Sequence, residues 1–288
     1  MRYRFVETHE REYRVVRLCN LLSLSRSGYY RWRMKPEGAR APENERLSHQ
    51  IRQIYGEGRG EYGSPTVYAA LRERGFAVNR KRVVRLMAKM QLYSKVVKKF
   101  KHTTKRCKDD QASPNLLKQD FRAEGRNRVW VSDITFIWTF EGWLYLTMIK
   151  DLFSRRVVGY AITDHLRAEG VLEALTKALR SRKVQPGLIF HSDRGKQYID
   201  RRVRELFVKY GIVQSMSSTG NCYDNAPAES FFATMKKGHL FWDPFQTREE
   251  ARRRIIEYLE VFYNCVRRHS SLGYKSPVAF ELQQATLA

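Results

Sequence analysis

Residues 129–162 decide the fold, because three apolar runs follow one another there with only short breaks. Residues 129–137 read VWVSDITFI, residues 143–149 read WLYLTMI and residues 157–162 read VVGYAI. All three are rich in β-branched and aromatic residues, which favour strands. Glu141-Gly142 predicts the first turn and residues 151–155 the second. Connections this short predict an antiparallel meander of three strands.

Downstream of the meander, helical and strand patterns alternate. The predicted elements are, in chain order, a helix over Ala168–Arg182, a strand over Leu188–Ser192, a helix around Arg202–Tyr210, a strand near Ile212–Met216, a helix that carries Glu229 and a long helix over about Arg248–Tyr263. Three strands followed by alternating helix and strand predict an α/β fold with a mixed five-stranded sheet and flanking helices, as in the ribonuclease H fold.

Three acidic residues stand out against these elements. Asp133 and Asp193 each follow an apolar run, so each is expected at the carboxyl end of its strand. If the two strands are neighbours, the aspartates lie about one strand spacing apart, ~5 Å. Glu229 opens a helix, because Pro227 fits only the first helical turn. Lys236 lies seven residues further along, two turns on the same helix face, and is expected to contact a phosphate.

Each of these acids alone has an ordinary explanation. An Asp at a strand end is often a turn or cap residue, and Glu229 near a helix start favours the helix dipole. Together, three converging carboxylates would repel one another unless divalent cations neutralised them. Magnesium prefers such hard oxygen ligands. The three acids therefore predict a site for one shared Mg²⁺ ion or for two, and we expect two Mg²⁺ ions, with Mn²⁺ as a substitute.

The charge of the chain indicates a polyanionic partner. The sequence holds 54 Lys and Arg against 30 Asp and Glu, a net charge of +24. Residues 1–120 hold 28 basic and 12 acidic side chains, a net +16, and residues 121–288 hold 26 and 18, a net +8. Phosphate backbones are the usual partners of such a field. An anionic membrane or an acidic protein is the alternative, but neither an amphipathic basic helix nor a lipidation signal supports it.

The first half of the chain predicts two helical DNA-binding units. Residues 12–34 have the pattern of helix, turn and helix, and residues 36–45 look like a linker. In the second unit Ser64 is the predicted N-cap, with Pro65 as the first helical residue, and Gly75 ends that helix. Asn79 is the predicted cap of the next helix, Arg80–Met90.

This last helix has one apolar and one basic side. The predicted buried residues are Val83, Val84, Leu86, Met87 and Met90, and the predicted DNA-contacting residues are Arg80, Lys81, Arg82, Arg85 and Lys89. A two-helix unit with a basic second helix is typical of a helix-turn-helix on DNA. The alternative is an ordinary solvated helical hairpin, which the +16 charge of this half disfavours.

Four domains follow from these patterns. They are a helix-turn-helix-like segment at 1–45, a second helix-turn-helix unit at 46–94, a basic linker at 95–120 and a catalytic core with its C-terminal helix and tail at 121–288. The linker is recognised by seven Lys or Arg within residues 95–108 without a clear period.

Cysteine and histidine spacing argues against structural zinc, since none of the four cysteines forms a C-x-x-C pair. Neither a signal peptide nor an apolar stretch of membrane-spanning length is found, so no membrane partner is expected and a reduced cytoplasmic compartment is the default location. The tryptophans Trp130, Trp138 and Trp143 are expected in the core rather than against bases. Arg194 and Lys196, beside Asp193, are expected to contact DNA.

Several short motifs resemble the insertion-sequence transposases of the orfB type, within the DDE transposase and retroviral-integrase superfamily. The resemblance covers nearly the whole chain. Its motifs are residues 25–30 (SRSGYY), 62–65 (YGSP), 143–146 (WLYL), 191–195 (HSDRG), 221–226 (NCYDNA), 229–232 (ESFF) and 263–277 with its RHSSLGY segment.

This resemblance implies an integrase-type catalytic core with Asp133, Asp193 and Glu229 as the Mg²⁺-binding triad and Lys236 as the following basic residue. It implies cleavage and strand transfer on double-stranded DNA, at the terminal inverted repeats and at target DNA. At least a dimer is expected on DNA, because two ends must be joined. Similar transposases are often made as fusions with an upstream helix-turn-helix and leucine-zipper protein. The chain has its own Met1 and no sustained heptad pattern, and retroviral integrases carry a zinc module whose residues are missing here.

Other kinds of protein share some of these patterns. A DNA-binding regulator with a non-catalytic core has no reason to keep three repelling carboxylates. An accessory subunit that is inactive without the upstream fusion partner stays an alternative. A tyrosine recombinase is suggested only by the short H-x-x-R match at His191 and Arg194, which arises easily by chance. A simple nuclease of the same fold would not need two helical DNA-binding units.

Overall fold

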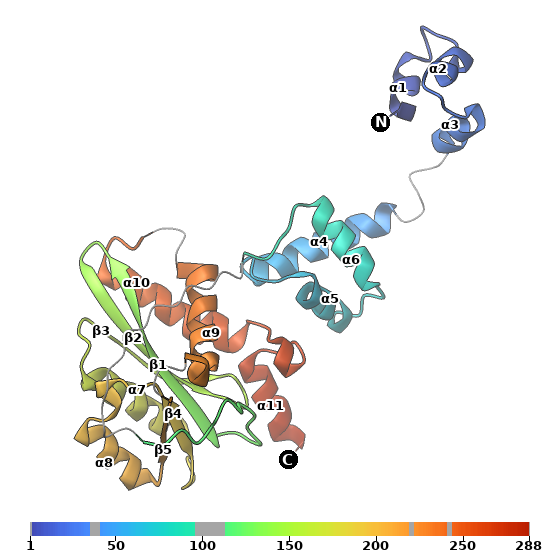
Figure 1. Ribbon diagram of the computed structural model, residues 1–288. Helices are drawn as coiled ribbons and strands as arrows, with labels where there is room; N and C mark the ends of the chain where they lie inside the picture. Colours follow the sequence, from blue (N-terminus) through green and yellow to red (C-terminus); the bar gives the residue numbers. More distant parts are fainter. Residues whose placement is uncertain (1, 35–40, 96–112, 219–221, 241–243, 288) are drawn as a thin grey trace. The chain divides into compact units, whose positions relative to one another are not determined.

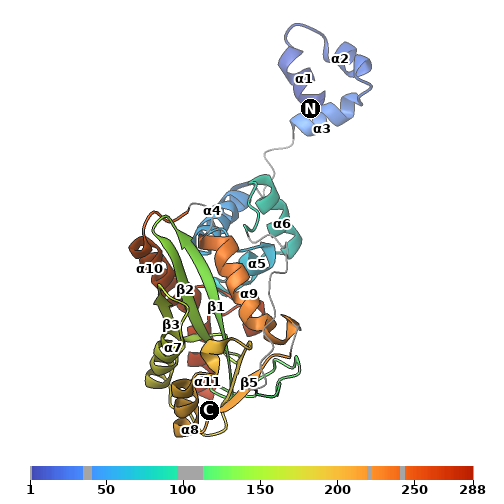
Figure 2. The same ribbon diagram turned by 60° about the vertical axis from the view of Figure 1, so that its left-hand side comes forward.

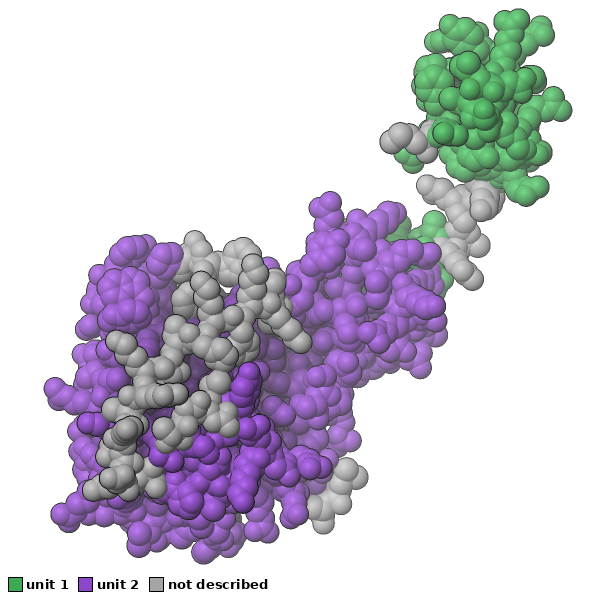
Figure 3. All heavy atoms as spheres, viewed as in Figure 1, with its two compact units in different colours: residues 1–53 green, residues 54–288 purple. Residues whose placement is uncertain are grey.

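The computed structural model describes residues 2–34, 41–95, 113–218, 222–240 and 244–287. Most of the basic stretch predicted as a linker, residues 96–112, lies outside these described residues. The chain forms two compact units, residues 1–53 and residues 54–288 (Figure 3). No helix in the described ranges combines the length and apolar character needed to span a membrane.

The first unit is helical. It holds α1 (Arg2–His9), α2 (Val15–Leu21), α3 (Arg26–Arg33) and most of α4 (Ala41–Glu57), which continues past residue 53. Helices α2 and α3 confirm the helix, turn and helix predicted over 12–34, and Ser25 caps α3 by accepting a hydrogen bond from the Gly28 N–H at 3.2 Å. The predicted linker at 36–45 is wrong from Ala41 on, because α4 begins there with Pro42 in its first turn, where proline costs no hydrogen bond.

The second unit begins with the end of α4 and continues into α5 (Ser64–Glu73) and α6 (Arg80–Lys89). Helices α5 and α6 pack against each other, and their buried residues are Val67, Ala70, Leu71, Val83, Leu86 and Met87. Asn79 caps α6 as predicted, since its side chain accepts from the Lys81 N–H at 2.8 Å. Two details differ. Gly63, not Ser64, is the N-cap of α5, and Val84 faces solvent because the buried stripe of α6 is narrower than expected.

A mixed five-stranded sheet forms the centre of the second unit (Figure 1). Its strands are β1 (Val129–Thr139), β2 (Gly142–Asp151), β3 (Val157–Thr163), β4 (Ile189–Ser192) and β5 (Val213–Met216), in the spatial order β3-β2-β1-β4-β5. Strands β1, β2 and β3 pair antiparallel, which confirms the meander, and β4 and β5 run parallel to β1. The fold class predicted from the sequence is therefore confirmed.

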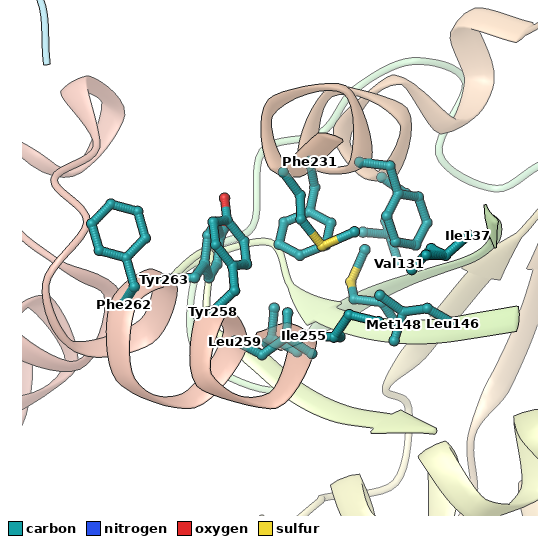
Figure 4. Close-up of a cluster of buried hydrophobic side chains, with 14 of the residues drawn as sticks. Val131, Ile137, Leu146, Met148, Phe231, Ile255, Tyr258, Leu259, Phe262 and Tyr263 are labelled. Carbon is teal, nitrogen blue, oxygen red and sulfur yellow. The ribbon is translucent and has the colours of Figure 1, made fainter. Parts of the chain in front are cut away.

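Helices cover both faces of the sheet. One face carries α7 (Ala168–Ser181) and α8 (Arg201–Tyr210), packed on a core that includes Trp130. The other carries α9 (Ala226–Met235) and α10 (Arg248–Ile256), the latter continuing as π-helical turns over Glu257–Tyr263. Neighbouring residues of β1 face opposite cores, as strand geometry requires. Figure 4 shows Val131 in the core of the second face, with Phe231 of α9 drawn above it and Ile255 of α10 below it.

Shorter elements complete the unit. They are the 3₁₀ turns Lys196–Tyr198, Cys222–Asn225 and Ser270–Leu272, the π-helical segment Lys236–Leu240 and a terminal helix α11 (Pro277–Leu287). The sequence did not predict α1, α4 or α11. Residues 114–117, assigned by the sequence to the linker, contact the sheet: the Met216 N–H donates to the Pro114 carbonyl at 3.3 Å, and Leu117 is buried in the core.

Candidate active site

Asp133 lies in the middle of β1, so its predicted place at a strand end is wrong. The reason is that β1 continues past Asp133 to pair with β2 as far as Thr139. Strand β4, on the other side of β1, pairs only with Val129–Val131 and ends at Ser192. Beyond residue 131, β1 therefore lacks its β4 neighbour, and Asp133 lies at this edge.

Asp193 follows directly on the last residue of β4, as predicted. Val131 pairs with His191 in the parallel register, and a continuation by two residues places Asp133 level with Asp193. Side chains two residues apart on a strand share a face. Asp133 therefore shares the face of Val131, which is the face covered by α9.

Glu229 lies in the first turn of α9, where Pro227 fits as expected. The start of α9 is tied to the sheet by two buried polar side chains. The Asn225 amide donates to the Ser132 carbonyl at 3.0 Å, and the Lys150 ammonium donates to the Pro227 carbonyl. These two bonds connect the helix that carries Glu229 to the residue before Asp133 and to strand β2.

Charge interactions show that the predicted residues form one group. The pKa of Asp133 is raised well above its ordinary value, first by burial and then by the negative charges of Asp193 and Glu229. The Ile134 N–H, at 2.8 Å from its carboxylate, and the Lys236 ammonium oppose this shift. Burial also raises the pKa of Asp193, although the Gly195 N–H donates to its carboxylate at 3.0 Å.

The donor set suits a divalent cation. Three carboxylates supply the hard oxygens that magnesium prefers. The pKa values of Asp133 and Asp193 are raised, so the positive charges of the protein nearby do not neutralise these two carboxylates. Among the described residues, however, no three His, Cys, Asp or Glu side chains already stand close enough to hold a metal ion. The acids are gathered, but their coordination geometry is not preformed.

Lys236 follows directly on the last residue of α9 and borders the site there. It begins the π-helical segment Lys236–Leu240, and its ammonium donates to the Phe136 carbonyl at 2.9 Å. Burial lowers its pKa, while the Asp133 charge acts in the opposite direction. The carbonyls of Ser132 and Phe136 on β1 are thus both bonded by side chains from the α9 region, Asn225 and Lys236.

Three residues of this site were missed by the sequence. Lys150 is fully buried, and burial is the first cause of its strongly lowered pKa. Tyr198 is buried too. Its hydroxyl lies 3.0 Å from the Ser132 hydroxyl, and its pKa is raised by burial and then by Asp193 and Asp133. An isolated lysine in an apolar strand was a usable signal for Lys150, whereas nothing in the sequence singles out Tyr198 or Asn225.

The remaining predicted residues surround the site or lie on α6. Arg194 is half-buried, and its guanidinium donates to the Ser217 carbonyl at 2.8 Å, while Lys196 is exposed. On α6, Arg80, Lys81, Arg85 and Lys89 are exposed and Arg82 is half-buried, as expected for the side opposite the core.

Comparisons with known proteins agree with this architecture. Two integrase core domain families match residues 123–222 and 210–277, and an HTH-like domain family matches residues 42–100. The chain is 43% identical to an uncharacterized 31 kDa protein of insertion element IS600 from Shigella sonnei, over 91% of this chain and 97% of the relative. It is 36% identical to transposase InsF of insertion sequence IS3A from Escherichia coli (strain K12), over 98% of each chain.

Another relative is the transposase of insertion sequence element IS904 from Lactococcus lactis, 40% identical over 83% of this chain and 94% of the relative. Among solved structures, the catalytic domain of Mos1 mariner transposase matches 47% of this chain and 71% of its own, with 17% identity and a TM-score of 0.39. The HTLV-2 integrase catalytic core domain in complex with magnesium (trimeric form) matches 55% and 99%, with 16% identity and a TM-score of 0.42.

Proposed function

Because the chain belongs to the insertion-sequence transposases with an integrase core domain, we propose that it cleaves DNA at the ends of its element and joins them to target DNA through Asp133, Asp193 and Glu229. Water would be the first nucleophile, and the freed 3′-hydroxyl the second. The observation that carries the proposal is the convergence at the β1 edge. Asp133 lies level with Asp193, Asn225 bonds the start of α9 to the Ser132 carbonyl, and the negative charges of Asp193 and Glu229 raise the pKa of Asp133.

The three carboxylates would hold two Mg²⁺ ions, or Mn²⁺ in their place, and bound metal would supply activation of the nucleophile and stabilisation of the leaving oxygen. The chain's own residues position the reaction. Asn225 and Lys150 fix the start of α9, so Glu229 is held over β1 by bonds to Ser132 and Pro227. Lys236, a cation beside Asp133, would bind the phosphate under attack.

DNA would be held by the basic residues around the site and on α6. Arg194 and Lys196 flank the strand under cleavage. The basic residues of α6 bind the terminal inverted repeat; they are Arg80, Lys81, Arg82, Arg85 and Lys89. Phosphate contacts of this kind weaken steeply as salt rises. Since two ends must be joined, the active form is at least a dimer on DNA, and an upstream helix-turn-helix and leucine-zipper protein is a possible fusion partner.

The test is to separate DNA binding from cleavage with the isosteric variant Asp193→Asn. End DNA should bind to this variant about as tightly as to the wild-type chain, while cleavage in Mg²⁺ falls by at least ~10³-fold, as for loss of a group that acts on the reacting atoms. Asp164→Asn, an exposed acid on the same unit, is the control and should cleave normally.

Three results would count against the proposal. Full cleavage by Asp193→Asn would remove that carboxylate from the chemistry. A wild-type chain that binds ends and stays inactive in Mg²⁺, with and without the upstream partner, would favour a DNA-binding regulator. A covalent protein–DNA adduct formed in EDTA would indicate a tyrosine recombinase instead.

A further inference from the structure

The outer end of the β1–β2 hairpin carries exposed aromatic rings on one face. Phe136 and Trp138 alternate along β1, and their partners directly across the ladder are Tyr145 and Trp143. These four residues form what we call the aromatic patch. Phe136, Trp138 and Trp143 are 46%, 46% and 47% exposed, so two of the three tryptophans expected in the core are not there. Trp130, further along the same face, is fully buried as predicted.

The aromatic patch begins where helix α7 no longer covers the sheet. On this face α7 lies over β3 and β2, and its Gly170 approaches Thr147 of β2 closely. Thr147 pairs with Ile134, and the next pair outward is Phe136 with Tyr145. Figures 1 and 2 show β1 and β2 as long strands whose turn lies far from α7. A solvated strand face is normally polar, so four aromatic residues here need another explanation.

The rings meet edge to face, which leaves flat surfaces open. The ring planes of Trp138 and Trp143 cross at 70° with centroids 4.9 Å apart, and those of Phe136 and Tyr145 cross at 84° with centroids 5.2 Å apart. Each pair therefore packs edge to face, while nearly half of the Phe136, Trp138 and Trp143 side chains stays exposed. Rigid aromatic faces of this kind bind flat, weakly polar groups by stacking.

The patch is adjacent to the proposed active site. Phe136 lies three residues beyond Asp133 on β1, about 10 Å along the strand. Its carbonyl accepts the bond from Lys236, so the same residue joins the site to the patch. The two lie on opposite faces of β1, and the edge between them is the one that β4 leaves at residue 131. A DNA strand that crosses this edge reaches the patch within about three nucleotides, at ~3.4 Å each.

The surrounding charges favour bases over phosphates. At the hairpin turn the Arg248 N–H donates to the Glu141 carboxylate at 2.7 Å, and the Arg248 guanidinium lies 3.9 Å from Asp164. One cation and two carboxylates leave a net charge of −1 at the turn, so the turn itself does not attract phosphates and the patch offers mainly stacking surface. The attraction for the backbone comes from Lys236 at one end and from the net +24 charge of the chain.

We propose that the aromatic patch stacks unpaired nucleobases of the DNA strand that leaves the active site across the open edge of β1. This inference rests on the proposed function, which brings a DNA strand next to the patch, but binding of single-stranded DNA by the patch can be measured separately. The partner class is single-stranded DNA next to the cleavage point, bound without regard to base identity. A second protein chain on the patch is the competing occupant.

The test uses the full chain in EDTA, with a ten-nucleotide oligothymidylate and a duplex of equal length as probes. The wild-type chain should bind the single strand with quenching of tryptophan fluorescence. Trp138→Ala and Trp143→Ala should each weaken that binding about tenfold, while Trp143→Phe keeps most of it. Tyr210→Ala, an exposed aromatic residue on α8, is the matched control and should bind normally. Thermal melting of each variant checks that it is folded.

Unchanged single-strand affinity in both tryptophan variants would overturn the inference. So would variants that lose self-association in sedimentation while they keep the affinity, since the patch would then bind a second chain. The assay is independent of catalysis. If the wild-type chain cleaves ends but the tryptophan variants bind the oligothymidylate normally, only this inference fails. If it binds the oligothymidylate through the patch but cleaves no DNA, only the proposed function fails.

Discussion

The most quantitative prediction concerns a buried ion pair, Glu61 with Arg267, which joins the segment after α4 to the chain after Tyr263. The Arg267 guanidinium donates to Glu61 at 2.9 Å, and only 1% of the Glu61 side chain is exposed. Glu61 also lies against Gly238, where a Cβ would come within 2.3 Å of its carboxylate oxygen. Gly238 is two residues after Lys236, so the ion pair lies next to the segment that carries this active-site lysine.

Arg267→Met should be strongly destabilising, because it removes the positive partner of the buried Glu61 carboxylate. Breaking a buried pair by removing one partner costs about 3–5 kcal/mol. In a unit of this size each kcal/mol lowers the melting temperature by about 2–4 °C, so a fall of ~10 °C is expected. Restoring neutrality with Glu61→Gln in the same chain should recover most of the loss, since a neutral pair avoids the charge penalty.

The destabilisation should depend on pH in a stated direction. Burial raises the pKa of Glu61 from its ordinary 4.5, and Arg267 partly opposes the shift. A carboxyl with a raised folded-state pKa binds its proton more tightly in the folded chain, so its contribution to stability falls as pH rises through that pKa. Without Arg267 the pKa rises further. The loss in Arg267→Met should therefore be larger at about pH 8 than at about pH 5.

Calorimetric melting of wild-type chain, Arg267→Met and the double variant at both pH values measures these effects. Arg201→Met, which removes an exposed partner of Glu205, is the control and should change stability by less than about 1 kcal/mol. A melting temperature of Arg267→Met within ~2 °C of wild type, or a loss that is the same at both pH values, would refute the reasoning.

Three further substitutions test the packing of the second unit by thermal melting. Gly159→Ala would place a Cβ 2.2 Å from the Ala174 carbonyl of α7, so it should cost about 1–3 kcal/mol or more, and a neutral result would mean that α7 does not lie this close to β3. Gly56→Ala meets no atom within 4 Å in the last turn of α4 and should stabilise by about 0.5–1 kcal/mol, so a loss of stability would contradict the helix there. Tyr62→Phe removes a hydroxyl that donates to the Val266 carbonyl at 3.0 Å and should cost about 1–3 kcal/mol, whereas an unchanged melting temperature would show that this contact contributes nothing.

Much of the fold was predictable from local patterns. The strands of the meander are β-branched and aromatic and have short turns, so β1, β2 and β3 were found within a few residues of their ends. Helix α4 was missed although Leu47, Ile51 and Ile54 recur at helical spacing, because Pro42 and polar neighbours suggested a linker. Proline is also common in the first turn of a helix, so Pro42 fits a helix start as well as a linker. Only the spacing of the apolar residues distinguishes a helix from a linker here.

The site was predictable in its residues but not in its geometry. Asp133 looked like a strand end because a charged residue interrupts an apolar run, whereas pairing with β2 carries β1 six residues further. The bonds from Asn225 and Lys150 that fix α9 join segments far apart in sequence, and no local pattern specifies such pairs. Trp138 is exposed because α7 does not extend over this end of the sheet, and the position of α7 depends on tertiary packing rather than on the local sequence.

The most direct measurement of the central claim is strand joining by the full chain on labelled DNA carrying the ends of its own element. Wild-type chain and Glu229→Gln would be compared in Mg²⁺, in Mn²⁺ and in EDTA, alone and with the upstream partner. The account predicts cleaved and joined products from the wild-type chain with either metal, and none from Glu229→Gln or in EDTA. Joined products from Glu229→Gln at the wild-type rate, or from the wild-type chain in EDTA, would contradict it.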